Sequence, residues 1–412
     1  MEHPNDALTL DTRDIQPDTH EARPPHNKDT SGGAAESRPS LPQDAAQDTS
    51  VTKAMVSQGQ PDSASDIRRT VHRGLSAAVP PDQLRQAIRL RTLALADRFR
   101  VIRTIDVAIA CFPERPFKAA LTAAQRAMRS LTKDKLLIRY RTDRFQHIYG
   151  LTAAGAHWLH DQNMDASPSV RRVSDMTNPE HTLWMTFVTL ACQTRGVAAH
   201  TEAEALQLLN QSRPSDTPAK QGFLTVESRG VRRALRPDVL SEEDDGATWY
   251  EIDRSKRGAD REASLVELVQ SIGATIANGS ILRRVVVHAK TERILKRALA
   301  LLRTLEKATQ EKTLTVGERG FREIDDGVFE VRALIKRRHD DGRTSLHEQL
   351  IGHVIIQLLP TWLPKVRIGT GNKYSLTGWF EENYLPYRRP DSLGPWRPAK
   401  SPLLRARRDS IS

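Results

Sequence analysis

The feature that most constrains this chain is a pair of short apolar segments, each of which carries acidic residues. Arg236-Pro237-Asp238-Val239-Leu240 comes first, and Trp249-Tyr250-Glu251-Ile252-Asp253-Arg254-Ser255-Lys256 follows. The acidic, Gly-containing loop between them, residues 241–246, predicts a hairpin turn, and its flanks predict two strands. Alternate residues of a strand share a face, so Glu251 and Asp253 point the same way, and Asp238 on the partner strand can reach the same spot.

Three carboxylates that converge at one strand end repel each other unless a cation lies between them. Oxygen ligands suit a hard ion, so Asp238, Glu251 and Asp253 are predicted to bind Mg²⁺ or Mn²⁺. Lys256 then supplies a positive charge close to the metal. The alternative is an ordinary solvated hairpin whose acidic residues have no common role.

This arrangement resembles the core of the PD-(D/E)xK nucleases, the restriction-endonuclease-like superfamily, with Asp253 where those enzymes usually hold Lys. The order of acids followed by a nearby Lys is more similar to a variant in replication-relaxation proteins and MobC-type plasmid relaxases, over roughly residues 85–305. Their pattern places Lys two residues after the second acid, where this chain has Ser255, with Lys256 one further on. His181-Thr182-Leu183 also resembles the His-x-Leu opening of replication-relaxation domains. His181 is therefore a candidate for orienting a phosphate or a water, or else a surface histidine in a capping turn.

The resemblance implies metal-dependent cleavage of one DNA phosphodiester bond, in the manner of nicking at a plasmid transfer origin. Asp238 and Glu251 would be the first metal ligands, and Asp253 would be a third ligand or a proton acceptor. Lys256 would stabilise the developing negative charge. None of the thirteen histidines forms a His-x-His pair, so the more familiar relaxase chemistry, which uses such a pair with a Tyr nucleophile, is not expected.

Charge is distributed unevenly along the chain of 412 residues, and its distribution indicates a polyanionic partner. The net charge is +11, yet residues 1–67 carry five basic and twelve acidic residues, so the remainder holds 57 basic and 39 acidic. A folded part this basic indicates nucleic acid first and an anionic membrane surface second. No apolar run approaches the roughly 18 residues of a membrane span, and the acidic N-terminus is unlike a signal peptide. Cys111 and Cys192, both in apolar stretches, are interpreted as buried thiols, and the expected location is the cytoplasm.

Periodic apolar residues between Pro80 and Lys133 predict three helices, and a short hairpin over residues 136–149 follows. Three helices and a two-stranded wing describe a winged helix-turn-helix, and Leu-Thr-Ala-Ala-Gly at 151–155 resembles the step that ends the wing in many bacterial winged-helix proteins. Residues 115–144 hold nine basic and two acidic side chains, which suits a recognition helix in the major groove of double-stranded DNA; the alternative is a solvated face on a protein-interaction winged helix. The predicted DNA contacts are Arg126 and Arg129 to base edges, Gln125 beside them, and Lys118, Lys133, Arg141 and Arg144 to phosphates.

The predicted fold class is α+β, with the parts in the following order. Residues 1–76 form a disordered tail, because they hold too few large apolar residues to offset chain entropy, residues 77–165 a winged-helix domain, and residues 166–177 a linker. Residues 178–310 form a restriction-endonuclease-like αβββαβ core, whose three strands are 223–227 and the two strands of the hairpin. Residues 311–412 form a helical C-terminal extension with an apolar helix at 346–359, and loose from residue 390. Its interleaved basic and aromatic residues either stack single-stranded DNA or form a cap over the core.

Two functions remain open from the sequence. One is a metal-dependent DNA-nicking protein of plasmid mobilisation or replication, acting at an origin where single-stranded DNA is a further partner. The other is a non-catalytic DNA binder, a relaxosome accessory or a replication or transcription regulator, that uses the winged helix alone. Other relaxosome or replication proteins are expected as partners in either case, and the oligomeric state is left open.

Overall fold

The computed structural model describes residues 80–141, 147–167, 179–211, 213–214, 216–228, 230–253, 259–311, 313–339, 342–359, 380, 384–401 and 403. The predicted disordered tail and most of the predicted linker fall outside these residues, as do Arg144, Lys256 and the side chain of Asp253. In the described part of the chain, no helix is long and apolar enough to cross a membrane.

Three helices open the described chain, as the apolar periodicity predicts. They are α2 (Pro81–Phe99), α3 (Thr104–Cys111) and α4 (Phe117–Lys133). In α4 the periodic apolar residues form one face of the helix. Ala124, Met128 and Leu131 of this face are buried, together with Phe117, while Leu121 is half-buried. The remaining face of α4 is left to polar and basic side chains.

A hairpin follows α4 and joins it to a fourth helix. Its strands are β1 (Leu137–Arg141) and β2 (His147–Leu151), which pair antiparallel, and α5 (Ala153–Asp161) comes next. Ile102, between α2 and α3, adds an isolated bridge to Tyr149 of β2, which ties the segment before α3 to the hairpin. The order of elements over this region is the predicted one.

The Leu-Thr-Ala-Ala-Gly step has a clear structural role. The Thr152 hydroxyl caps α5 by accepting from the Gly155 N–H at 3.0 Å, and it donates to the Lys135 carbonyl at 2.7 Å. Gly155 lies against the turn between α4 and β1, where an added Cβ would stand 2.3 Å from the Leu136 carbonyl oxygen. The step therefore fixes α5 to the end of α4.

Replacing Gly155 with alanine is expected to lower the free energy of unfolding by at least about 2 kcal/mol, because the methyl group forces the α4–β1 turn and α5 apart. Urea unfolding of the full chain measures this. Gly150→Ala, in the adjacent strand β2, is the matched control: its Cβ would meet the Arg100 carbonyl oxygen at an ordinary 3.4 Å. Equal stability of the two variants would show that the close approach is not needed.

The central feature of the rest of the chain is a mixed sheet of seven strands, so the chain is an α+β protein. Its order is β3-β6-β7-β8-β11-β10-β9, in which β8 runs parallel to both β7 and β11 and the other neighbours are antiparallel. The strands are β3 (Ala198–Thr201), β6 (Val239–Glu243), β7 (Gly246–Asp253), β8 (Leu282–Ala289), β9 (Arg319–Asp325), β10 (Val328–Arg338) and β11 (Thr344–Leu358).

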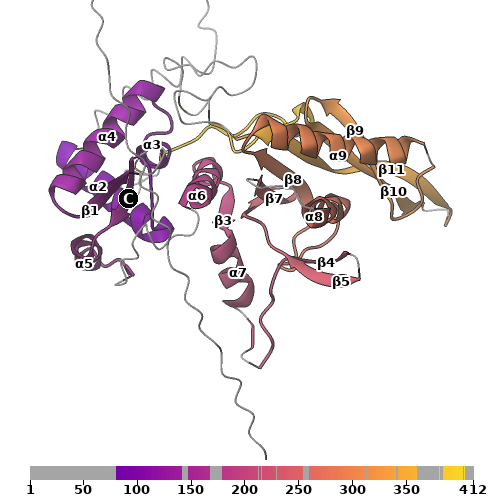
Figure 1. Ribbon diagram of the computed structural model, residues 1–412, viewed down its shortest axis with the longest axis horizontal. Helices are drawn as coiled ribbons and strands as arrows, with labels where there is room; N and C mark the ends of the chain where they lie inside the picture. Colours follow the sequence, from indigo (N-terminus) through magenta and orange to yellow (C-terminus); the bar gives the residue numbers. More distant parts are fainter. Residues whose placement is uncertain are drawn as a thin grey trace, which may run out of the picture. The chain divides into compact units, whose positions relative to one another are not determined.

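Both faces are buried at the centre of this sheet, and strand alternation divides its residues between them. Val285 and Val287 enter one apolar cluster, together with residues of α8 and α9, whereas Val286 enters another with residues of α6 and the N-terminal helices. Figure 1 shows α9 lying along β9, β10 and β11. The helices are α6 (Pro179–Gln193), α7 (Glu202–Gln211), α8 (Ala259–Gln270) and α9 (Glu292–Gln310).

Two details of the predicted core are wrong. The strand predicted at residues 223–227 is β4 (Leu224–Ser228), but it pairs with β5 (Val231–Leu235) in a separate two-stranded sheet, because Gly230, with φ of 75°, closes a local hairpin. The strand beside β6 is instead β3. The loop predicted over residues 241–246 is mostly strand, since Gly246, with φ of 140°, lets the chain turn in two residues.

The helical C-terminal extension is also wrong in its described part. Residues 346–359, predicted as a helix, belong almost entirely to β11, and β9 and β10 precede it. Ile351, Val354, Ile355 and Ile356 are β-branched and buried, and a strand covered on both faces gives a continuous apolar run that looks like a buried helix.

Residues 384–401, expected to be partly loose, are held in place. Tyr384 and Tyr387 are wholly buried, so neither is available to stack on a DNA base. The Lys400 N–H donates to the Thr194 carbonyl at 2.8 Å, and the Ser401 hydroxyl donates to the Cys111 carbonyl at 2.7 Å. This segment therefore ties the end of α6 to the end of α3.

Candidate functional site

Asp238 stands where the chain enters β6, and its carboxylate is fixed from two sides. Its backbone N–H donates to the Tyr250 carbonyl at 3.0 Å, which extends the β6–β7 ladder by one residue. Its Oδ2 accepts from the Ile252 N–H at 2.6 Å, and its Oδ1 lies 3.0 Å from the Nε2 of His181. The side chain is 16% exposed, so it is held at the rim of the core without being sealed from solvent.

Glu251 of β7 is oriented by the residue two positions before it on the same face. The indole N–H of Trp249, which is fully buried, donates to its Oε1 at 2.7 Å. Tyr250 points to the other face, where its ring is buried against His288, as expected for a packing residue. The strand thus directs Glu251 to the face that α8 and α9 cover.

His181 lies in the first turn of α6, and its side chain is 25% exposed. Beside it, the Glu180 carboxylate binds the Nζ of Lys290 at 2.8 Å. Together these contacts bring the start of α6 to the ends of β6, β7 and β8. The sequence marked His181 by its resemblance alone, and the structure places it in contact with Asp238.

His181, Asp238 and Glu251 line one cleft with a volume of about 970 Å³. Three arginines line the same cleft: Arg236, Arg261 of α8 and Arg297 of α9. They were not among the predicted site residues, because Arg261 and Arg297 lie on helices whose position over the sheet no sequence motif reveals. The cleft floor is apolar and includes Leu265, Leu268, Val287, Ala298 and Leu301.

The described residues contain no group of three or more His, Cys, Asp or Glu side chains placed to hold a metal ion. The predicted third ligand, Asp253, belongs to β7, but its side chain lies outside those residues, as does Lys256. Asp238 and Glu251 nevertheless fit a hard divalent cation, since Mg²⁺ commonly takes one or two carboxylates, several waters and substrate phosphate. These two carboxylates are therefore of the kind that Mg²⁺ or Mn²⁺ accepts as ligands.

The predicted DNA contacts of α4 lie on its solvent side. Lys118, Arg126, Arg129 and Lys133 are exposed and Gln125 is half-buried, opposite the buried stripe. Arg141 is exposed at the end of β1, and Arg144 lies outside the described residues. Sequence periodicity was enough to place these side chains, because the helix has one strongly apolar face.

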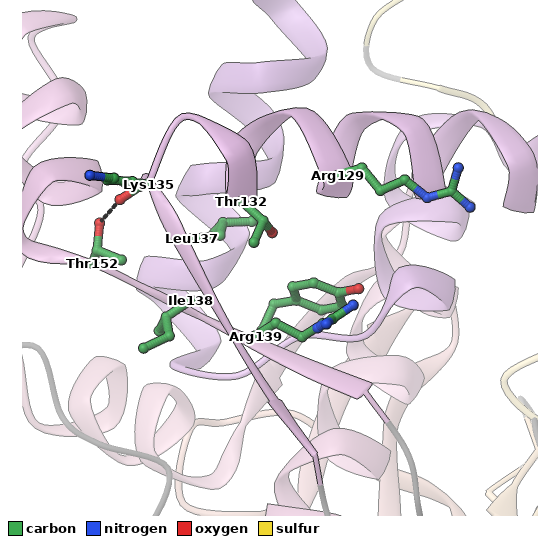
Figure 2. Close-up of a pocket in the computed structure, with 8 residues that line it drawn as sticks. Arg129, Thr132, Lys135, Leu137, Ile138, Arg139 and Thr152 are labelled. Carbon is green, nitrogen blue, oxygen red and sulfur yellow. Dashed lines mark hydrogen bonds between the residues drawn. The ribbon is translucent and has the colours of Figure 1, made fainter.

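A second hollow, of about 550 Å³, lies between α4 and the hairpin (Figure 2). Arg129, Lys135 and Arg139 contribute cations to its lining, and Arg139 had not been singled out from the sequence. Basic side chains therefore continue from the helix onto β1.

His288 on β8 is fully buried, as expected for a core histidine, and burial lowers its pKa to about 4, partly offset by a hydrogen bond with the Pro386 backbone. Cys111 and Cys192 are free and buried, and burial raises the pKa of both thiols to about 12, so neither is a reactive thiolate.

The low pKa of buried His288 makes the free energy of unfolding depend on pH. The unfolded chain protonates this histidine below about pH 6.5, whereas the folded chain holds it neutral until about pH 4, so its contribution is complete above pH 6.5 and is lost as the pH falls to 4. Between pH 7 and 5 the loss is about 2 kcal/mol. Urea unfolding at pH 7 and pH 5 measures this loss. The free energy of unfolding of His288→Phe should fall by about 2 kcal/mol less than that of the unaltered chain between the two pH values. An unchanged loss in the variant would contradict the assignment.

No family model, curated protein or solved structure matches this chain.

Proposed function

We propose that this chain binds double-stranded DNA through α4 and the β1–β2 hairpin and cleaves one DNA strand with Mg²⁺ or Mn²⁺, as a replication-relaxation or MobC-type protein acting at an origin. The observation that carries the proposal is the cleft lined by His181, three arginines and three carboxylates. Two of these carboxylates, Asp238 and Glu251, come from neighbouring positions of the sheet, and the third, Glu262, pairs with Arg297 at 3.8 Å. Carboxylates hold a cation, and guanidinium groups hold phosphates, so the lining suits a metal-bound phosphodiester.

The elements around α4 support the DNA-binding half. Three helices, a two-stranded hairpin and a bridge from Ile102 to the hairpin are the parts of a winged helix-turn-helix. In that fold the third helix enters the major groove, and α4 is the third helix of this region. Its exposed Arg126 and Arg129 would reach base edges, with phosphates left to Lys118, Lys133 and Arg141.

The order of elements around the cleft supports the cleavage half. Helix α6, strands β3, β6 and β7, helix α8 and strand β8 follow the αβββαβ order of PD-(D/E)xK proteins, with α7 and the β4–β5 hairpin as insertions. Asp238 stands at the entry to β6 and Glu251 on β7, the second and third strands of that order.

Each residue of the cleft then has a role. Asp238 and Glu251 would hold the ion, which would supply an activated water and stabilise charge on the scissile phosphate. Asp253, expected as a third ligand, has its side chain outside the described residues. His181 keeps the Asp238 carboxylate in place. Arg236, Arg261 and Arg297 neutralise flanking phosphates. The role expected for Lys256, to stabilise the developing charge, falls on a residue outside those that the structure describes.

The second candidate is a non-catalytic DNA binder that retains the fold. It is favoured by one observation: both oxygens of Asp238 already have partners within the protein, Ile252 N–H and His181. In that case the two contacts are structural, and DNA binding does not depend on the cleft.

Replacing Arg126 and Arg129 together with alanine tests the DNA-binding half. The double variant is expected to bind duplex DNA at least about 100-fold more weakly, since each such contact contributes about 1–3 kcal/mol. Fluorescence anisotropy with a labelled duplex measures this. Lys296→Ala/Lys307→Ala, two exposed cations of α9, is the charge-matched control. Equal losses in both variants would contradict a specific role for α4.

A further inference from the structure

The β10–β11 hairpin extends past its neighbours in the sheet. β9 pairs with residues 328–333 of β10, and β8 pairs with residues 353–358 of β11. Beyond those points, residues 334–338 and 344–348 pair with each other, and Leu334 also bridges to Val316 (Figure 1, right). We call these two stretches the arm.

A bulge marks the base of the arm: Val331 is opposite Gly352 and Arg332 is opposite Leu350, so Ile351 of β11 is the extra residue. Bulges bend and twist a strand, so the strand direction changes where the arm begins. Arg332 is held there by Glu330 and Glu348, at 2.9 and 3.8 Å.

Neither face of the arm is covered by the described chain. Ile335 is 38% exposed and Leu346 is 54% exposed, on opposite faces. An isolated two-stranded ribbon is at best marginally stable in water. We therefore expect a binding partner to stabilise the arm.

The chemistry of the arm identifies that partner. Lys336, Arg337 and Arg338 follow one another, all three are exposed, and in the described part of the chain none of them forms an ion pair. Their charge therefore faces solvent, where it suits phosphate groups. The carboxylates of this region are Glu348, at the base, and Asp340 and Asp341 of the turn, which is outside the described residues.

One face of the arm also carries a row of hydrogen-bonding groups. Arg337 is opposite Ser345, and the Ser345 hydroxyl lies 2.5 Å from the Nε2 of His339 and 2.6 Å from that of His347. The cations Lys336 and Arg338 share the other face with Leu346 and Thr344. Donors and acceptors on one face with cations beside them match base edges flanked by phosphates.

We propose that the arm is a second DNA-contacting element, which lies in the major groove of duplex DNA with the face of Arg337 toward the bases. The major groove, about 12 Å wide, admits a two-stranded ribbon. This inference rests on the proposed function, because both take duplex DNA as the partner. The residues of the arm, however, belong neither to α4 nor to the lining of the cleft.

The test uses the full chain and a mixed-sequence duplex of about 30 base pairs, roughly three helical turns. Lys336→Ala/Arg337→Ala/Arg338→Ala is expected to weaken binding at least about 10-fold and to reduce the slope of log affinity against log salt by about 2 to 3. The control Lys296→Ala/Lys307→Ala/Arg322→Ala removes three exposed cations from α9 and β9 and should change neither quantity. Unchanged thermal unfolding shows that the arm variant is folded.

Equal effects in the arm variant and its control would overturn the proposal, because they would reflect net charge alone. A change of oligomeric state in the arm variant at unchanged DNA affinity would also overturn it, since the arm would then bind a second copy of the chain. Failure of the winged-helix proposal can be distinguished from failure of this one. It would appear as unchanged DNA affinity in Arg126→Ala/Arg129→Ala.

Discussion

Asp238→Asn is expected to lower the rate of DNA strand cleavage by about 100- to 1,000-fold, while DNA affinity stays within about twofold. Asparagine can still accept the Ile252 N–H, so the β6–β7 junction is kept, but it cannot supply the charge that holds a divalent cation. Initial rates of nicking and anisotropy titrations separate the two effects.

Glu242→Gln is the control for this variant. Glu242 is on β6, the strand that Asp238 precedes, but its carboxylate accepts from the Asn278 amide at 2.7 Å and it is not part of the cleft lining. Its rate should equal that of the unaltered protein. If Asp238→Asn also cleaves at the full rate, the carboxylate has a structural role and the non-catalytic alternative stands.

Arg284→Leu is expected to lower the free energy of unfolding by about 3–5 kcal/mol, the largest stability effect predicted for this chain. Arg284 on β8 has no exposed surface, and it binds Asp245 through both terminal nitrogens and the Glu243 carboxylate at 3.1 Å through Nε. Burial alone would lower the pKa of the guanidinium, but its hydrogen bonds with Asp245 raise it, so the group stays charged.

The same network holds the C-terminal segment. The Tyr387 hydroxyl donates to Glu243 at 2.9 Å, and Arg389 lies 3.1 Å from the other Glu243 oxygen. Replacing Arg284 alone removes one of the cations paired with the buried Glu243 carboxylate, so its negative charge is only partly compensated. Arg284→Leu/Glu243→Leu should therefore be more stable than Arg284→Leu, as urea unfolding can measure. A double variant that is less stable than the single one would contradict this explanation.

Local patterns were sufficient for the three N-terminal helices and for the position of basic side chains on α4. One apolar face, with Ala124, Met128 and Leu131, defines both the helix and the side on which Arg126 and Arg129 are exposed. The carboxylates Asp238 and Glu251 were also placed correctly at neighbouring strand positions, because strand alternation and a short hairpin leave few arrangements.

Long-range packing accounts for what the sequence did not reveal. Residues 346–359 look helical by length and hydrophobicity, and they form a strand because β8 and β10 flank them. The short strand β3 carries no strong pattern and is defined by its pairing with β6. Arg261 and Arg297 reach the cleft because α8 and α9 pack on the same face of the sheet, which no motif records.

The measurement that tests the central claim most directly is conversion of a supercoiled plasmid that carries the cognate mobilisation region, with Mg²⁺, with Mn²⁺ and with a chelator. The account predicts open circles that form with either metal, are absent with the chelator, and are strongly reduced in Asp238→Asn. A plasmid that stays supercoiled with both metals, despite salt-sensitive binding by the same protein, would contradict cleavage and leave a DNA-binding accessory or regulator.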